Sequence, residues 1–186
     1  GLLFAFVWTR VARPFGAELA AKRLTRSSWR DIVSLTEPAS LAEHRQLGVQ
    51  ILDRLMQHLP RLAMTGQDTG IALREVRVAL NLLDLLAYTP RVAGVPQALL
   101  HQVVAEVGEY FKACLKAGER LPAPSPLLMT LDRTRRALDS ECDDGARLHL
   151  LHALSGLRLA LLPGVEFVGT GEREEPLPHG IDGAPL

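Results

Sequence analysis

Hydrophobic residues recur every three or four positions along most of this chain, which is the spacing of one face of an α-helix. The densest stretch covers residues 71–88 and reads IALREVRVALNLLDLLAY. Its main apolar stripe is Leu73, Val76, Leu80 and Leu83, and other apolar residues widen it (Val78, Leu82, Leu85 and Leu86). We therefore predict a helix that is buried on most sides and lies among other helices.

One narrow polar seam interrupts the apolar surface of this helix. Its members, each three or four residues after the last, project along one line of the helix: Arg74, Arg77, Asn81 and Asp84. In one interpretation the arginines grip a planar anion such as a carboxylate substrate. In the other, which we favour, the seam pairs with acids or helix ends on neighbouring helices and fixes the register of a bundle, because half-buried charges normally exist as pairs.

Helix boundaries can be read from the residues that start and stop helices. A break at residues 36–38 ends a first basic helix over 18–35. Ser40 and Glu43 form a capping box for a second helix, which Pro60 should kink or split. The 71–88 helix should end near Pro90.

Three further helices follow, over about 96–117, about 127–142 and from 143–144 to Pro163, with Gly118 as the C-cap of the first. Inward positions are predicted for the first and the last of these helices: Leu99, Val103, Val107, Tyr110 and Phe111, then Leu148, Leu151, Leu154, Leu157 and Leu161. In the helix over 127–142 we expect Leu128, Leu131 and Leu138 inside. Beyond Val165 to Val168 there are few strand signals. The sequence thus predicts an all-α fold, an antiparallel bundle of five to six helices with a disordered C-terminal tail over 169–186.

Composition restricts the chemistry that this chain can perform. With 186 residues, 47% of them hydrophobic, it can form one domain with a real core, and 21 basic against 21 acidic residues give no overall attraction to nucleic acid. Cys114 and Cys142 have no CxxC or Cys/His spacing, which favours free thiols in a reducing compartment over a metal site or disulfide.

No enzymatic signature occurs in the sequence: there is no phosphate-binding glycine loop, G-x-S-x-G or H-E-x-x-H motif. We therefore predict no enzyme, no catalytic residue and no cofactor. His149 and His152 share a helical face, but leucines flank them, so two histidines without a metal are the better interpretation.

The beginning of the chain is unlike the rest. An apolar run, LLFAFVW over residues 2–8, is followed by six basic residues and only one acid before Asp31; the basic ones are Arg10, Arg13, Lys22, Arg23, Arg26 and Arg30. An apolar end, a boundary tryptophan and a dense basic flank are typical of the cytoplasmic end of a transmembrane helix, so we expect the chain to be a fragment of a longer one. An amphipathic helix of a soluble protein is the alternative. A nucleic-acid arm fits less well, since Phe15 and Trp29 are its only stacking candidates.

The order of segments resembles one known family. The quoted segments are TRVARPFGAELAAKRLTRSSWRDI, LDRLMQHLPRLA, ALREVRVALNLLDL, EVGEYFKACL and LSGLRLALLPGVEF. In this order they resemble the C-terminal cytoplasmic part of the fusaric acid resistance (FUSC) family, or aromatic acid exporters, which includes the membrane subunit of the p-hydroxybenzoate efflux pump. The resemblance covers essentially residues 1–168.

The resemblance implies four segments: the end of the last transmembrane helix (1–9), a basic juxtamembrane helix (10–38), a cytoplasmic helical domain (39–168) and the tail (169–186). It implies an inner-membrane efflux transporter of aromatic carboxylic acids or fusaric-acid-like compounds, with this region on the cytoplasmic side. Expected partners are the remainder of the transporter, a periplasmic membrane-fusion protein and further copies of the chain, without nucleic acid. A free-standing adaptor that binds a partner helix or an anionic membrane through the basic stem is the alternative.

Overall fold

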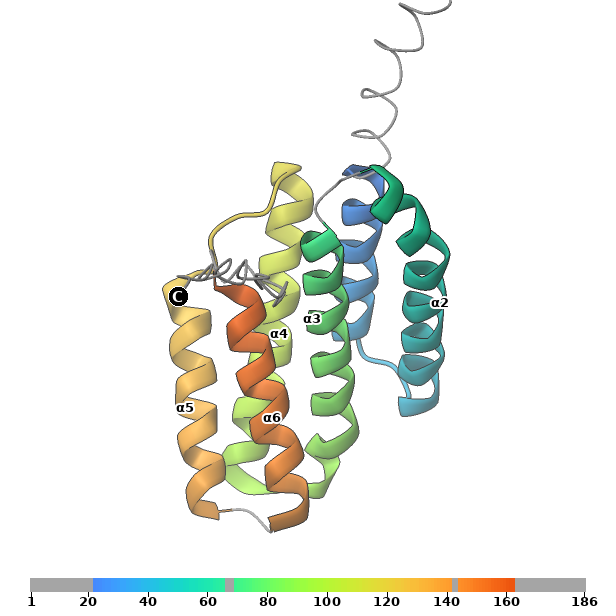
Figure 1. Ribbon diagram of the computed structural model, residues 1–186. Helices are drawn as coiled ribbons and strands as arrows, with labels where there is room; N and C mark the ends of the chain where they lie inside the picture. Colours follow the sequence, from blue (N-terminus) through green and yellow to red (C-terminus); the bar gives the residue numbers. More distant parts are fainter. Residues whose placement is uncertain (1–21, 66–68, 142–143, 163–186) are drawn as a thin grey trace, which may run out of the picture.

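The computed structural model describes residues 22–65, 69–141 and 144–162, and all regular structure within them is helical (Figure 1). A helix over residues 22–36 is followed by α2 (Leu41–Thr65), α3 (Thr69–Tyr88), the 3₁₀ turn η1 (Thr89–Arg91), α4 (Gly94–Ala117), α5 (Ser125–Glu141) and α6 (Asp144–Leu161). The predicted all-α bundle of five to six helices is therefore confirmed. Residues 1–21, Val165 to Val168 and the predicted tail lie outside the described residues.

Two predicted caps set helix ends as the sequence indicates. Before α2, the Ser40 N–H and hydroxyl both donate to Glu43 Oε2, at 2.7 and 2.8 Å, and the Glu43 N–H donates back to Ser40 Oγ at 3.3 Å. These hydrogen bonds also lower the pKa of Glu43, with the one from the backbone contributing most. After α4, Gly118 adopts φ 78°, and its N–H donates to the Cys114 carbonyl at 2.8 Å.

Pro60 was predicted to kink or split the second helix, and the structure shows the kink. α2 runs unbroken from Leu41 to Thr65, and Figure 1 shows the ribbon bending in its last turns. Proline removes one backbone donor, and a bend accommodates its ring while the helix continues.

The helices run alternately up and down, so helices that follow each other in the chain are antiparallel (Figure 1). α3 packs against both α2 and α6, α4 against α5, and α5 against α6. The 22–36 helix lies beside α2, where Asp31 and Arg54 form an ion pair, and beside α4, where Thr36 touches Gly108. The 22–36 helix begins at the same end of the bundle at which α6 ends (Figure 1).

The core is built around α4, whose predicted inward residues are all buried: Leu99, Val103, Val107, Tyr110 and Phe111. On α5, Leu131 and Leu138 are buried as expected, and Leu128 is half-buried against the core. Leu154, Leu157 and Leu161 bury the inner face of α6, and Leu151 is half-buried against it.

Three predicted inward leucines face outward instead. Leu73 is 45% and Leu80 39% exposed, so α3 is open on one side and buries Val78, Leu82 and Leu85. α3 is apolar nearly all round, so periodicity alone could not select which of its sides the neighbouring helices cover.

Leu148 on α6 is 68% exposed, so its predicted inward position is also wrong. Leu150, two residues further along the helix, is fully buried instead. Residues two positions apart, such as Leu148 and Leu150, lie about 200° apart around a helix. Leu148 is thereby turned away from the core that Leu150 enters.

Candidate functional site

The predicted polar seam lies along α3, and its members face different surroundings. Asn81 donates from Nδ2 to the Arg77 carbonyl at 2.8 Å and packs directly on Gly156 of α6. A Cβ atom at Gly156 would lie 2.5 to 2.8 Å from the Asn81 side chain, so this glycine allows α3 and α6 to approach closely.

The other three seam residues differ in their exposure. Arg74 is partly buried, with no hydrogen-bond partner for its Nε, and Arg77 and Asp84 are exposed. The structure places Asn81 at a helix contact and Asp84 at a surface hollow. Whether the arginines bind an anion or fix the register of the bundle stays a prediction.

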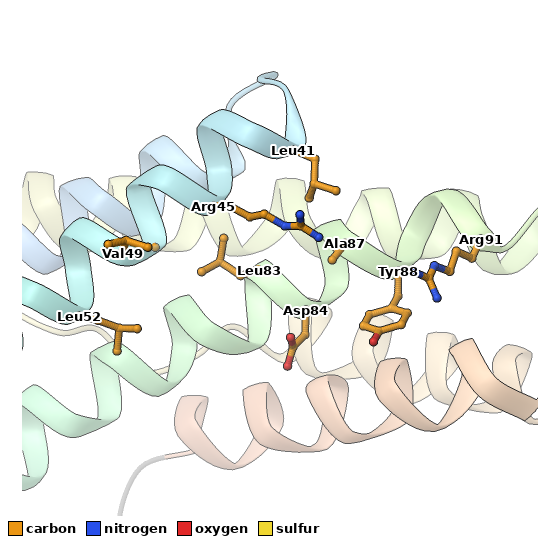
Figure 2. A pocket seen from close by; sticks show the side chains of 10 residues that line it. Leu41, Arg45, Val49, Leu52, Leu83, Asp84, Ala87, Tyr88 and Arg91 are labelled. Carbon is orange, nitrogen blue, oxygen red and sulfur yellow. The ribbon is translucent and has the colours of Figure 1, made fainter.

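The hollow lies between the first half of α2 and the second half of α3 and has a volume of about 530 Å³, with Arg91 of η1 among its lining residues (Figure 2). Its lining is mostly apolar: Leu41, Gly48, Val49, Leu52, Leu83, Ala87 and Tyr88, with Arg45, Asp84 and Arg91 as the charged members. In Figure 2, Arg45 reaches from α2 towards Ala87, while Asp84 points away from α2, towards α6.

Tyr88 and Arg91, which line this hollow, also take part in aromatic contacts. The Tyr88 ring stacks on His149 of α6, with centroids 4.3 Å apart and planes at 9°, and the Arg91 guanidinium lies 4.8 Å from the Tyr88 centroid. His149 thus contacts an aromatic ring, and His152 is exposed. Among the described residues no group of three or more His, Cys, Asp or Glu side chains could hold a metal ion.

A buried ion pair that the sequence patterns did not predict lies at the end of the bundle opposite η1. Arg120, in the connector between α4 and α5, pairs through Nη1 with Glu75 Oε1 of α3, and its Nη2 donates to the Ala160 carbonyl of α6 at 2.8 Å. Glu75 is only 1% exposed, and its other oxygen has no hydrogen-bond partner. One guanidinium therefore ties the connector to two helices.

Further polar groups of the connector gather beside this ion pair. The Tyr110 hydroxyl donates to the Leu121 carbonyl at 2.7 Å, and the Leu121 N–H lies 3.4 Å from the Cys114 thiol sulfur, which accepts its hydrogen bond. Burial raises the pKa of Tyr110 well above its usual value, so the phenol stays protonated and acts as a donor. The burial of Glu75, though not its partner, could have been predicted from the sequence, because Glu75 shares a helical face with the buried Val78 and Leu82.

Further ion pairs join neighbouring helices, among them Arg147 of α6 with Asp139 of α5, whose charged atoms lie 3.7 Å apart. Arg54 pairs with Asp31 and donates to Ser27 Oγ at 2.9 Å. Burial raises the pKa of Asp31 more than the nearby Arg54 lowers it.

Between α5 and α6, Arg158 binds Asp132 with two hydrogen bonds, of 2.7 and 3.2 Å. These hydrogen bonds hold the pKa of Asp132 below its usual value. Both residues are partly exposed, so this pair fixes geometry more than it adds stability.

The basic flank is only partly described. Lys22, Arg23, Arg26 and Arg30 are exposed on the 22–36 helix, and Arg10 and Arg13 lie outside the described residues. Trp29 is 3% exposed and packs in the core, so it cannot stack on bases, as the nucleic-acid alternative required. None of the helices in the described ranges is sufficiently long and apolar to span a bilayer.

Several ion pairs and hydrogen bonds of the described residues join neighbouring helices, and the described part of the chain is a helical bundle with an apolar hollow between α2 and α3. The chain belongs to the fusaric acid resistance protein family (FUSC), whose family model matches residues 1–168. This family consists of membrane-associated transporters and not of enzymes. Neither a curated protein nor a solved structure matches the chain.

Proposed function

We propose that this chain is the cytoplasmic C-terminal part of an inner-membrane efflux transporter that exports aromatic carboxylic acids or fusaric-acid-like toxic compounds, as the p-hydroxybenzoate efflux pump does. The family match over residues 1–168 is the observation that carries this proposal. In the proposed arrangement, residues 1–9 are the end of the last transmembrane helix and residues 10–38 lead away from the membrane. The remainder of the transporter and a periplasmic membrane-fusion protein are its partners.

The charge distribution supports this orientation. The exposed cations Lys22, Arg23, Arg26 and Arg30 belong to the first described helix, directly after the apolar and basic segments of the sequence. A cytoplasmic membrane surface carries negative charge and attracts such residues within about 10 Å. In this arrangement the bundle end at which residue 22 lies faces the bilayer (Figure 1).

Deletion and complementation of the gene that encodes this chain test the proposal. A deletion strain should accumulate p-hydroxybenzoate and fusaric acid inside the cell, and its growth should be poor when either compound is added. The intact gene should restore efflux, whereas a version lacking codons for residues 39–162 should not. A lipophilic cation serves as the control toxin, and its accumulation should not change. Equal accumulation of the aromatic acids with and without the gene would refute the proposal.

The exposed cations also favour a second candidate, an adaptor that binds anionic membranes through its stem alone. Flotation with anionic liposomes separates the two candidates. A stem held only by charge should leave the vesicles as salt rises, because salt screens its attraction to the lipids. A chain anchored by the end of a transmembrane helix should stay bound.

A further inference from the structure

One face of the bundle exposes an apolar surface that nothing in the described structure covers. Six large hydrophobic side chains that are at least 38% exposed lie on two adjacent helices: Leu41, Val49, Leu52 and Met56 on α2, with Leu73 and Leu80 on α3. Val49 and Met56 are the most exposed, at 58% and 66%. Contiguous apolar surface of this kind is typical of a protein interface. We call these six residues and the hollow between them the α2–α3 face.

The contact between α2 and α3 fixes which residues lie at the same height on this face. Gly48 approaches Leu83 so closely that a Cβ atom there would lie 2.4 Å from Leu83 Cδ1. Because the two helices are antiparallel, Arg45 and Asp84 lie on the same side of this contact, three residues and one residue from it. At 1.5 Å rise per residue their heights differ by about 3 Å.

Arg45 and Asp84 carry opposite charges. Arg45 and Asp84 both line the hollow and are exposed, and neither has an ion-pair partner among the described residues. Figure 2 shows the two side chains pointing in different directions. The face thus offers one cation on α2 and one anion on α3 at nearly one height.

We propose that the α2–α3 face binds the same face of a second copy of this chain. A two-fold axis parallel to the helices places α2 of each copy against α3 of the other. Arg45 then meets the partner's Asp84, and this ion pair occurs twice. The apolar rows meet in the same way, since Leu52 lies near the height of Leu80 on the opposing α3.

This axis has a geometric consequence that agrees with a membrane-attached chain. It leaves the residue-22 ends of both copies at the same end of the dimer, so that both can face one membrane. The proposal rests on the exposed side chains and not on transport. Sedimentation measures self-association without any transport assay, so the dimer can be refuted or supported independently of the proposed function.

Charge reversal with complementation tests the dimer. Arg45→Asp places two like-charged pairs across the interface, and so does Asp84→Arg. Each variant of the 1–186 chain, in mild detergent, should dissociate at about tenfold higher concentration in sedimentation experiments. A mixture of the two variants should form heterodimers as tight as the wild type, because every new charge then faces its opposite. The double variant should dimerise on its own.

A matched control reports on non-specific effects. Met129 on α5 is 69% exposed, similar to Met56, but lies away from this face. Met129→Asp should leave association unchanged, whereas Met56→Asp should weaken it. Circular dichroism establishes that all variants keep their helical content. A monomeric wild type, or a mixture of single variants that fails to associate, would overturn the proposal; either result would mean that another part of the polypeptide, the lipid or a different protein covers this face.

Discussion

Helices α2 and α4 have nearly the same length but opposite surroundings. α4 has 24 residues and buries ten of them, including Phe111 and Val107. α2 has 25 residues, and only His44, Gly48 and Ile51 are buried among those whose side chains are described. Both helices show apolar periodicity, so the pattern that fills the core in one forms an open surface in the other.

The difference shows what apolar periodicity does and does not determine. A stripe of leucines and valines indicates that one side of a helix avoids water. It does not determine whether that side packs inside its own chain or against another molecule. Variants in the two regions should therefore act on different properties: stability for the interior, association for the α2–α3 face.

The largest effect is expected from separating the buried Glu75–Arg120 pair. Arg120→Met leaves the Glu75 carboxylate buried without its cation, which should lower the free energy of unfolding by about 3–5 kcal/mol. Urea denaturation measures this loss. The double variant Glu75→Leu/Arg120→Met should recover most of it, since no buried charge remains. Arg133→Met, at an exposed position on α5, is the control; a loss no larger than that of the control would contradict the structural role of the pair.

A smaller difference should separate the core from the α2–α3 face. Leu100 is fully buried, so Leu100→Ala should cost about 2–5 kcal/mol through lost burial and a residual cavity. Leu52→Ala, at a site that is 40% exposed, should cost about 0.5 kcal/mol or less in the monomer. Thermal unfolding at low protein concentration compares them. Equal losses would show that α2 packs as α4 does.

The smallest effect concerns pH. The lowered pKa of Asp132 means that its ionised form stabilises the fold above the unfolded-state pKa, and this contribution is lost as pH falls through the folded-state pKa. Asp132→Asn should therefore cost about 0.5 kcal/mol at neutral pH and nothing in strong acid.

Asp31 has the opposite sign, because its pKa is raised on folding. Its contribution is complete below the unfolded-state pKa and is lost as pH rises through the folded-state pKa. The free energy of unfolding of the wild type should therefore increase relative to that of Asp31→Asn as the pH is lowered through this range. Urea titrations at a series of pH values measure both trends, and parallel curves for the two variants would contradict them.

Local signals predicted much of this fold. The Ser40–Glu43 capping box, the Gly118 cap and the break near Pro90 depend on residues that lie close together in the chain, so the sequence contained what was needed. The family could be recognised from the order of segments, and the family match confirms it.

Long-range contacts could not be predicted in this way. Glu75 and Arg120 are 45 residues apart, and nothing local marks them as partners. The outward positions of Leu73 and Leu80 depend on which neighbours cover α3, and the hollow exists only because α2 and α3 meet at Gly48. These features belong to the arrangement of helices and not to any one helix.

The position of Arg120 also has a mechanical consequence. Because the described chain enters and leaves the bundle at the same end, a force applied between residues 22 and 162 would peel helices apart from that end, and would not slide them past one another (Figure 1). The guanidinium that clasps Glu75 and the Ala160 carbonyl lies at this end. The contacts of Arg120 with Glu75 and Ala160 would therefore be among the first to bear the force, and they would resist separation of the helices.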